Sequence, residues 1–139
     1  MVQVVILDTN VLSALMHGQS SAVIGWLDRQ AASGIWTTAI TVYESRFGIA
    51  LLPDGRKRTV LAERFEAMVG GPLRGRVLPF DAAAAEMAAR LGASRRARGV
   101  SVEVRDTLIA GIVLVRGARL ATRNVRHFPD VAVVNPWEE

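Results

Sequence analysis

The stretch Val4-Val5-Ile6-Leu7-Asp8-Thr9-Asn10 decides the fold class of this 139-residue chain. Its first four residues are apolar, and an uninterrupted run of this kind is typical of a strand buried on both faces of a parallel sheet. Asp8 then falls where the strand ends, and in open α/β folds this edge of the sheet carries the ligand crevice. The alternative is that Asp8, Thr9 or Asn10 only caps a helix that begins near Val11.

Further strands are predicted at intervals along the chain. The short apolar segments typical of strands are Val2–Leu7, Ile35–Thr38, Val77–Phe80, Arg119–Thr122 and Val131–Val134. The segments between them carry apolar residues at helical spacing, and Asp81 is expected to cap an alanine-rich helix that runs to Arg98. This alternation predicts a single α/β domain, residues 1–139, with helices flanking a mainly parallel central sheet. The pattern does not give the strand order.

Composition restricts the class of protein. Half of the residues are apolar, which is enough for a buried core, and the chain has no cysteine. Disulfides and thiolate metal sites are therefore excluded. The longest apolar stretch, Leu108 to Val115, is too short to cross a bilayer, which needs about 20 residues. Because the first predicted strand begins at residue 2, we expect no signal peptide, no membrane association and a cytoplasmic location.

The net charge is +4, and Lys57 is the only lysine among the 17 basic residues. Arginine suits bidentate recognition of phosphate. Two clusters stand out, Arg56-Lys57-Arg58 and Arg95-Arg96 with Arg98. They are compatible with contacts to a nucleic-acid backbone, and equally with an ordinary solvated surface and a bias in base composition.

Four oxygen-bearing side chains are expected near one edge of the sheet. Asp8 follows the first strand, Asn124 follows the fourth, and Glu44 and Asp106 lie near the starts of predicted helices. Three of these residues also have an ordinary structural explanation. Glu44 could be a solvated glutamate on a helix, Asp106 a helix N-cap, and Asn124 a residue in a left-handed turn. Carboxylates about 4 Å apart repel by about 4 kcal/mol at an effective dielectric of about 20. If these carboxylates converge, their repulsion would raise their pKa values or favour the binding of a cation. Oxygen ligands select hard ions such as Mg²⁺ or Mn²⁺.

The chain resembles PIN-domain nucleases in four short motifs. These are Leu7-Asp8-Thr9-Asn10-Val11, Thr41-Val42-Tyr43-Glu44, Arg105-Asp106-Thr107-Leu108-Ile109-Ala110 and Thr122-Arg123-Asn124. Two more stretches are similar to the VapC toxins, in particular to their FitB-like branch: Phe47-Gly48-Ile49-Ala50-Leu51-Leu52-Pro53 and Val134-Asn135-Pro136-Trp137. Each motif is short, but together they follow the family order along the whole chain.

The resemblance implies a PIN fold and a Mg²⁺- or Mn²⁺-dependent endoribonuclease, the toxin of a type II toxin–antitoxin system. It also implies a homodimer and a cognate DNA-binding antitoxin. The residues that match the family's catalytic positions are Asp8, Glu44, Asp106 and Asn124, with Asp8 and Asp106 expected to hold the metal. The residues expected to contact substrate are Thr9, Asn10, Arg123 and His127. The aromatic and apolar residues considered for the dimer interface, against core packing, are Trp26, Trp36, Phe47 and Leu51.

Two positions depart from the family pattern. His127 stands where such toxins commonly carry another acid, so one tightly bound metal is favoured over two. For a lone histidine, core packing or a surface position is favoured over phosphate binding. Thr107 follows Asp106 where alanine is usual, and we expect this change to be tolerated.

Other families fit less well. An aspartate-nucleophile phosphatase would need an acid at the position of Asn10 and a later lysine than Lys57, and a response-regulator receiver fails for similar reasons. The alternatives that remain are a non-catalytic RNA- or protein-binding module with a PIN-like fold, and a DNA-directed nuclease of the same fold.

Overall fold

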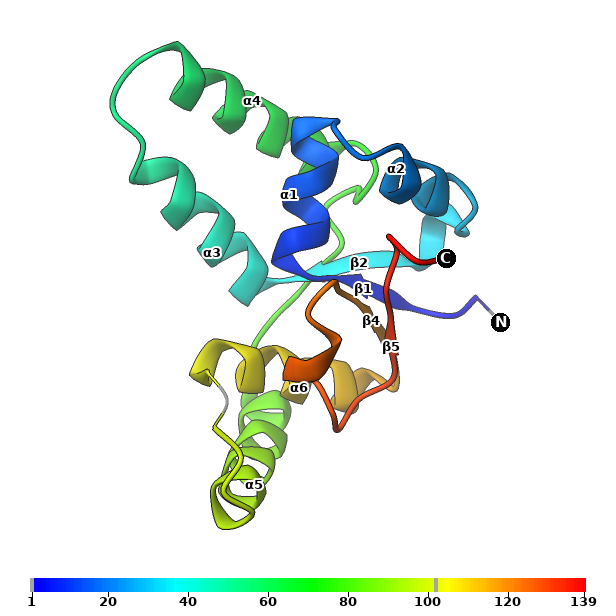
Figure 1. Ribbon diagram of the computed structural model, residues 1–139, viewed down its shortest axis with the longest axis vertical. Coiled ribbons are helices and arrows are strands. Elements are labelled where there is room, and N and C mark those ends of the chain that lie inside the picture. Colours follow the sequence, from blue (N-terminus) through cyan, green and yellow to red (C-terminus); the bar gives the residue numbers. More distant parts are fainter. Residues whose placement is uncertain (1, 102) are drawn as a thin grey trace.

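The computed structural model describes residues 2–101 and 103–139, and the first predicted strand lies at the centre of its sheet (Figure 1). This strand, β1 (Val5–Leu7), pairs in parallel with β2 (Ile35–Thr38) and with β4 (Arg119–Ala121). Outside them lie β3 (Val77–Leu78) next to β2 and β5 (Val133–Val134) next to β4. The strand order is β3-β2-β1-β4-β5, and all of these pairings are parallel. The carboxyl ends of the strands therefore meet at one edge.

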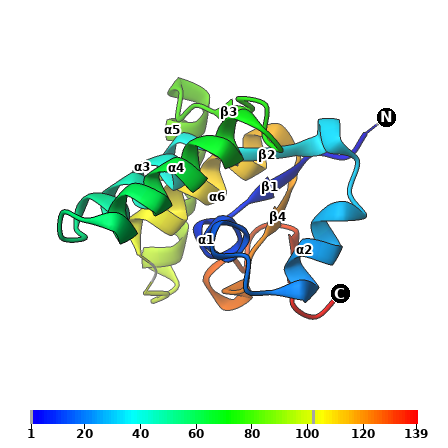
Figure 2. The ribbon, with the colours of Figure 1, turned by 90° about the horizontal axis from the view of Figure 1, so that it is seen from above.

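Helices cover both faces of the sheet, so the domain has three layers (Figures 1 and 2). One group of helices is α1 (Thr9–His17), α2 (Ser21–Asp28), α3 (Ala39–Ala50) and α4 (Arg56–Gly70). The opposite group is α5 (Ala82–Ala97) and α6 (Val104–Arg116). Two short 3-10 turns, η1 (Ala32–Gly34) and η2 (Val125–His127), complete the described elements.

β1 separates two hydrophobic cores. Val5 and Leu7 pack into the core under α1, α2 and α4, whereas Ile6 packs into the core under α5 and α6. This alternation follows from the two-residue period of a strand. Burial on both faces explains why the run is apolar at every position.

The fold class predicted from the sequence is confirmed, and the differences concern the ends of elements. The observed strands are shorter than the predicted segments, except that β2 matches its prediction at both ends. Thr38, the last residue of β2, is also the N-cap of α3, so this helix begins directly after the strand. Asp81 caps α5 as predicted, with its Oδ1 accepting a hydrogen bond from the Ala84 amide at 3.0 Å.

Two residues considered for the dimer interface pack in the cores, as the alternative of core packing has it, and one arginine of a predicted surface cluster is buried. Trp26 is buried in the first core, and Trp36 packs, partly buried, against the second. Arg95 was grouped with surface arginines, yet only 2% of its side chain is exposed. An arginine in that position needs polar partners, which sequence spacing alone does not reveal.

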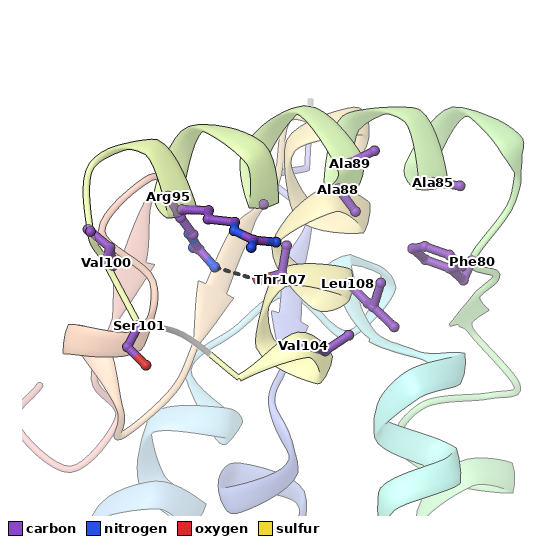
Figure 3. A pocket seen from close by; sticks show the side chains of 13 residues that line it. Phe80, Ala85, Ala88, Ala89, Arg95, Val100, Ser101, Val104, Thr107 and Leu108 are labelled. Atoms are coloured by element: carbon purple, nitrogen blue, oxygen red, sulfur yellow. Dashed lines mark hydrogen bonds between the residues drawn. The ribbon is translucent and has the colours of Figure 1, made fainter.

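Arg95 joins α5 to α6 and to the segment before β5. Its Nε donates to Asp130 Oδ2 at 2.8 Å. Its Nη1 donates to Thr107 Oγ1 at 3.0 Å (Figure 3). Arg95 and Thr107 lie at an apolar cavity of about 640 Å³ lined mainly by α5 and α6. The two helices approach closely beside it, because a Cβ on Gly111 would lie 2.8 Å from the Ala84 carbonyl oxygen. Thr107, the departure from the family pattern, thus serves as a partner of Arg95.

Within the described residues, no helix is both long and apolar enough to cross a membrane.

Replacement of Asp130 by alanine is expected to destabilise the fold by about 3 kcal/mol, because the Arg95 charge would stay buried without its partner. Burial alone would raise the pKa of Asp130, but the hydrogen bonds and charges of Arg95 and Arg98 outweigh it and lower that pKa. The ion pair therefore stabilises fully at neutral pH, and its contribution disappears as the pH falls through the lowered folded-state pKa. Denaturant unfolding measures the free energy of unfolding of the unchanged protein and of Asp130→Ala. The difference between the two values should become smaller at acidic pH. As a control, Arg98→Ala at a half-exposed side chain should cost less than about 1 kcal/mol.

Candidate functional site

A cavity of about 360 Å³ opens at the carboxyl edge of the sheet. Its lining brings together the four predicted catalytic residues, three of the four predicted substrate contacts, and two residues that the sequence did not single out. The lining residues are Asp8, Thr9, Asn10, Ser13, Glu44, Glu103, Asp106, Asn124 and His127. Segments far apart in the sequence thus converge on one cavity, as the parallel sheet predicts.

Asp8 is both the N-cap of α1 and a member of this cavity, so the two interpretations of the β1–α1 junction hold together. Its Oδ1 accepts a hydrogen bond from the Thr9 amide at 2.8 Å, and only 4% of the residue is exposed. Burial raises the pKa of Asp8, and the charge of Asp106 raises it further, while the hydrogen bond from Thr122 opposes the shift. Burial contributes more to the shift than the repulsion between carboxylates on which the sequence argument relied.

Thr122 connects the end of β4 to the end of β1. Its hydroxyl donates to Asp8 Oδ2 at 2.7 Å and accepts from the Asn124 amide at 3.0 Å. The Asn10 side chain completes the network, with Nδ2 at 3.3 Å from both Asp8 Oδ2 and Thr122 Oγ1. Thr122 is fully buried and was quoted only as part of a motif. Its position as the last, polar residue of a predicted strand was the signal that could have identified it.

Glu44 points its carboxylate toward α1 and α6. Thr9 Oγ1 donates to Glu44 Oε1 at 2.8 Å, and Arg105 Nη1 lies 3.6 Å from Glu44 Oε2. The side chain is 19% exposed, which does not fit a freely solvated helical glutamate. Arg105 also forms an ion pair with Glu103, and this pairing raises the pKa of Arg105. Nothing in the spacing of the sequence indicated that Arg105 would be a neighbour of Glu44.

Asp106 occupies the first turn of α6 and is not its N-cap, because Glu103 holds that position. Its Oδ2 lies 3.0 Å from His127 Nδ1. Burial raises the pKa of Asp106; the nearby His127 opposes this shift, and Glu103 and Glu44 add to it. His127 lies at the surface, one of the two locations favoured for it, but it is also in direct contact with an acid of the cavity.

Asn124 and Arg123 follow β4 and have different surroundings. Asn124 lines the cavity with a φ of −90°, so the left-handed turn proposed as an alternative is wrong. The Arg123 amide donates to Asn10 Oδ1 at 3.0 Å. Its guanidinium carbon lies 4.7 Å from the centre of the Trp137 ring, in a cation–π arrangement. A role of Arg123 in substrate binding remains a prediction.

The cavity offers oxygen donors that suit a hard divalent cation. Among the described residues, no group of three or more acidic or histidine side chains is arranged to hold a metal ion. Asp8 and Asp106 nevertheless lie close enough for the charge of Asp106 to affect the pKa of Asp8. Two carboxylates with water as the remaining ligands are a usual environment for Mg²⁺, so the residues present fit such an ion.

Comparisons with known proteins agree with this geometry. The PIN domain family matches residues 5–134. The VapC ribonuclease Y4jK of Sinorhizobium fredii is 39% identical over 96% of this chain and 98% of its own length. The toxin FitB of Neisseria gonorrhoeae is 37% identical over 97% of this chain and 99% of its own length.

Solved structures show the same relationship. The crystal structure of FitAcB from Neisseria gonorrhoeae superposes with a TM-score of 0.88 at 37% identity, covering 97% of this chain and 99% of the matched chain. A structure of FitAB bound to an IR36 DNA fragment gives a TM-score of 0.86 at 38% identity, covering 96% and 95%. The parallel sheet, the acidic cavity at its carboxyl edge and these matches lead to one conclusion: the chain belongs to the PIN-domain family, among its VapC and FitB toxins.

Proposed function

We propose that this protein is a Mg²⁺- or Mn²⁺-dependent endoribonuclease and the toxin of a type II toxin–antitoxin system, acting in the cytoplasm. The observation that carries the proposal is the convergence of Asp8, Glu44, Asp106 and Asn124 on one cavity. The names of its relatives, a VapC ribonuclease and a FitB toxin, support the same activity.

Asp8 and Asp106 are the residues that would hold the ion, and their raised pKa values express the cost of keeping a buried and a partly buried carboxylate charged without a cation. When bound, the ion supplies an acidified water as nucleophile and a positive charge beside the phosphate. Thr122 and Asn10 orient Asp8, and Thr9 holds Glu44 toward the cavity. Asn124, which lines the same cavity, would orient a water, and the contact with His127 would hold Asp106 in position.

Two alternatives remain distinct from this proposal. A non-catalytic binding module has no reason to hold Mn²⁺ at Asp8 and Asp106, so calorimetry with Mn²⁺ separates it from an enzyme. A DNA-directed nuclease would cut a single-stranded DNA loop as well as the matched RNA loop. We favour RNA loops as targets, because their exposed bases and 2′-hydroxyls are accessible to a protein groove.

Asp106→Asn should reduce RNA cleavage by more than about 100-fold, because even the groups that orient metal ligands usually affect activity by about 10- to 100-fold. Asp8→Asn should have the same effect. Each change removes a buried charge, so the free energy of unfolding should equal or exceed that of the unchanged protein. Cleavage assays with excess Mg²⁺ and denaturant unfolding check both statements. Full activity of either variant, or of the wild type in excess EDTA, would contradict the proposal.

The cleaved RNA should carry 5′-phosphate and 3′-hydroxyl ends, because water and not the ribose 2′-hydroxyl acts as nucleophile. A metal-independent ribonuclease would leave 2′,3′-cyclic phosphates and would usually employ histidine as base. The chain's two histidines have different partners here: His17 Nδ1 contacts the Ser13 carbonyl, and His127 contacts Asp106. Mapping of RNA ends by ligation after incubation decides the matter, and cyclic phosphates would overturn the mechanism.

We also propose a homodimer that binds a cognate DNA-binding antitoxin. Three large apolar residues, Tyr43, Phe47 and Leu51, recur every four positions along α3 and are 56%, 46% and 70% exposed. They form one apolar stripe on the surface, a feature typical of protein interfaces. Phe47 and Leu51 thus remain interface candidates, unlike Trp26 and Trp36. The relatives described as FitAB and FitAcB complexes support an antitoxin partner, and an antitoxin arginine entering the acidic cavity would inhibit by its charge.

Leu51→Glu should shift the protein from dimer to monomer at micromolar concentration, because it places a charge on the apolar stripe without disturbing the core. Light scattering coupled to size exclusion measures the change. Ile24→Glu is the matched control, since Ile24 is an exposed apolar residue on α2. A wild type that is already monomeric would refute the dimer.

A further inference from the structure

A groove leads away from the acidic cavity along α1, between α3 and α4. Its first part, a cavity of about 310 Å³, shares Thr9, Ser13 and Glu44 with the acidic cavity. Its second part, about 480 Å³, shares His17, Lys57 and Leu61 with the first. We call these two parts together the α1 groove. It is continuous with the candidate site at one end and reaches the start of α4 at the other. Figure 1 shows the arrangement of α1, α3 and α4, the helices that carry its lining.

The charge of the α1 groove changes sign along its length. Among the described residues that line it, Glu44 is the only acid, and it lies at the end shared with the acidic cavity. The far end is lined by Arg56, Lys57 and Arg64, with His17 beside them. The groove therefore runs from an acidic site to a basic one.

The three cations of the far end have no acidic partner among the residues that the structure describes. None of them forms an ion pair in the described part of the chain, whereas Arg58, their neighbour on α4, pairs with Asp54 at 2.8 Å. Arg64 donates to the Met16 carbonyl at 3.3 Å, which joins α4 to α1 at the wall of the groove. Unpaired cations gathered beside one groove raise the local potential and favour a polyanion.

We propose that the α1 groove is the path along which single-stranded RNA leaves the cleavage site, with Arg56, Lys57 and Arg64 holding its backbone phosphates. This inference rests on the proposed ribonuclease function and adds the direction of the strand across the protein. The phosphate to be cut lies at the acidic cavity, and the next nucleotides run along α1 toward the basic end.

The walls of the groove suit an unpaired strand. Met16, Ile49 and Leu52 provide apolar surface for bases that are not stacked in a helix. Ser13 and Ser45 add hydroxyl groups in the first part, where a ribose 2′-hydroxyl would pass. The other predicted cluster does not offer such a path, because Arg95 is buried and paired with Asp130.

The test measures binding of labelled RNA to the Asp106→Asn protein, with and without the double change Arg56→Ala and Lys57→Ala. Both residues are exposed, so the fold should be retained. A single-stranded RNA of about 12 nucleotides, long enough to fill the groove, should bind several-fold more weakly to the changed protein. The dependence of log K on log salt should become less steep by about 0.7 for each phosphate contact that is lost. A dinucleotide, which reaches only the acidic cavity, should bind equally to both proteins.

The double change Arg96→Ala and Arg116→Ala is the control of equal charge, because both residues are exposed and neither lines the α1 groove. It should leave the affinity for the longer RNA unchanged. Equal affinity and salt slope in the Arg56→Ala and Lys57→Ala variant would overturn the proposal, as would an equal loss for the dinucleotide. Unchanged RNA binding together with loss of a bound antitoxin would assign the groove to a protein and also overturn it. Failure of the proposed ribonuclease function can be distinguished from failure of the proposed RNA path, because in the first case the wild type would not cleave RNA at all.

Discussion

The hydrogen bond from the Thr122 hydroxyl to the Asp8 carboxylate joins the ends of two strands that are 114 residues apart in the chain. It exists because β1 and β4 are parallel neighbours whose register pairs Leu7 with Ala121. A slip of one residue in that register would turn the following side chains to the opposite face of the sheet. The hydrophobic residues that fix the register, Ile6 and Leu120 among them, therefore also fix the distance between the polar groups of the site. The apolar sheet and the acidic cavity depend on the same constraint.

The acids of the cavity are stabilised separately, each by its own partners. Asp8 accepts hydrogen bonds from Thr9, Asn10 and Thr122, Glu44 contacts Thr9 and Arg105, and Asp106 contacts His127. This arrangement explains why burial, and not mutual repulsion, is the main cause of the raised pKa values of Asp8 and Asp106. A divalent ion in the proposed site would have to share Asp106 with His127.

Much of this structure is predictable from local patterns. The unbroken apolar run before Asp8 indicated a strand in a parallel sheet, and Asp81 indicated the start of α5. Because polar residues at the ends of parallel strands share one edge, the convergence of Asp8 and Asn124 also followed. The sequence did not predict the strand order, the burial of Arg95 or the contact between His127 and Asp106. These depend on contacts between distant segments, which the spacing of residues does not encode.

Asp8 has two tasks, since it begins α1 as its N-cap and also contributes to the acidic cavity. Asp106 caps no helix, and its neighbours in α6 provide the packing. Loss of an N-cap typically costs about 1 kcal/mol, so most replacements at Asp8 would weaken the fold as well as the site. Mutations could therefore remove the activity of this protein in two ways, by changing the site alone or by changing the site and lowering the stability of the fold. A lineage that loses the activity through Asp106 would keep a protein of unchanged stability, whereas one that loses it through Asp8 would keep that stability only with another good N-cap residue such as Asn.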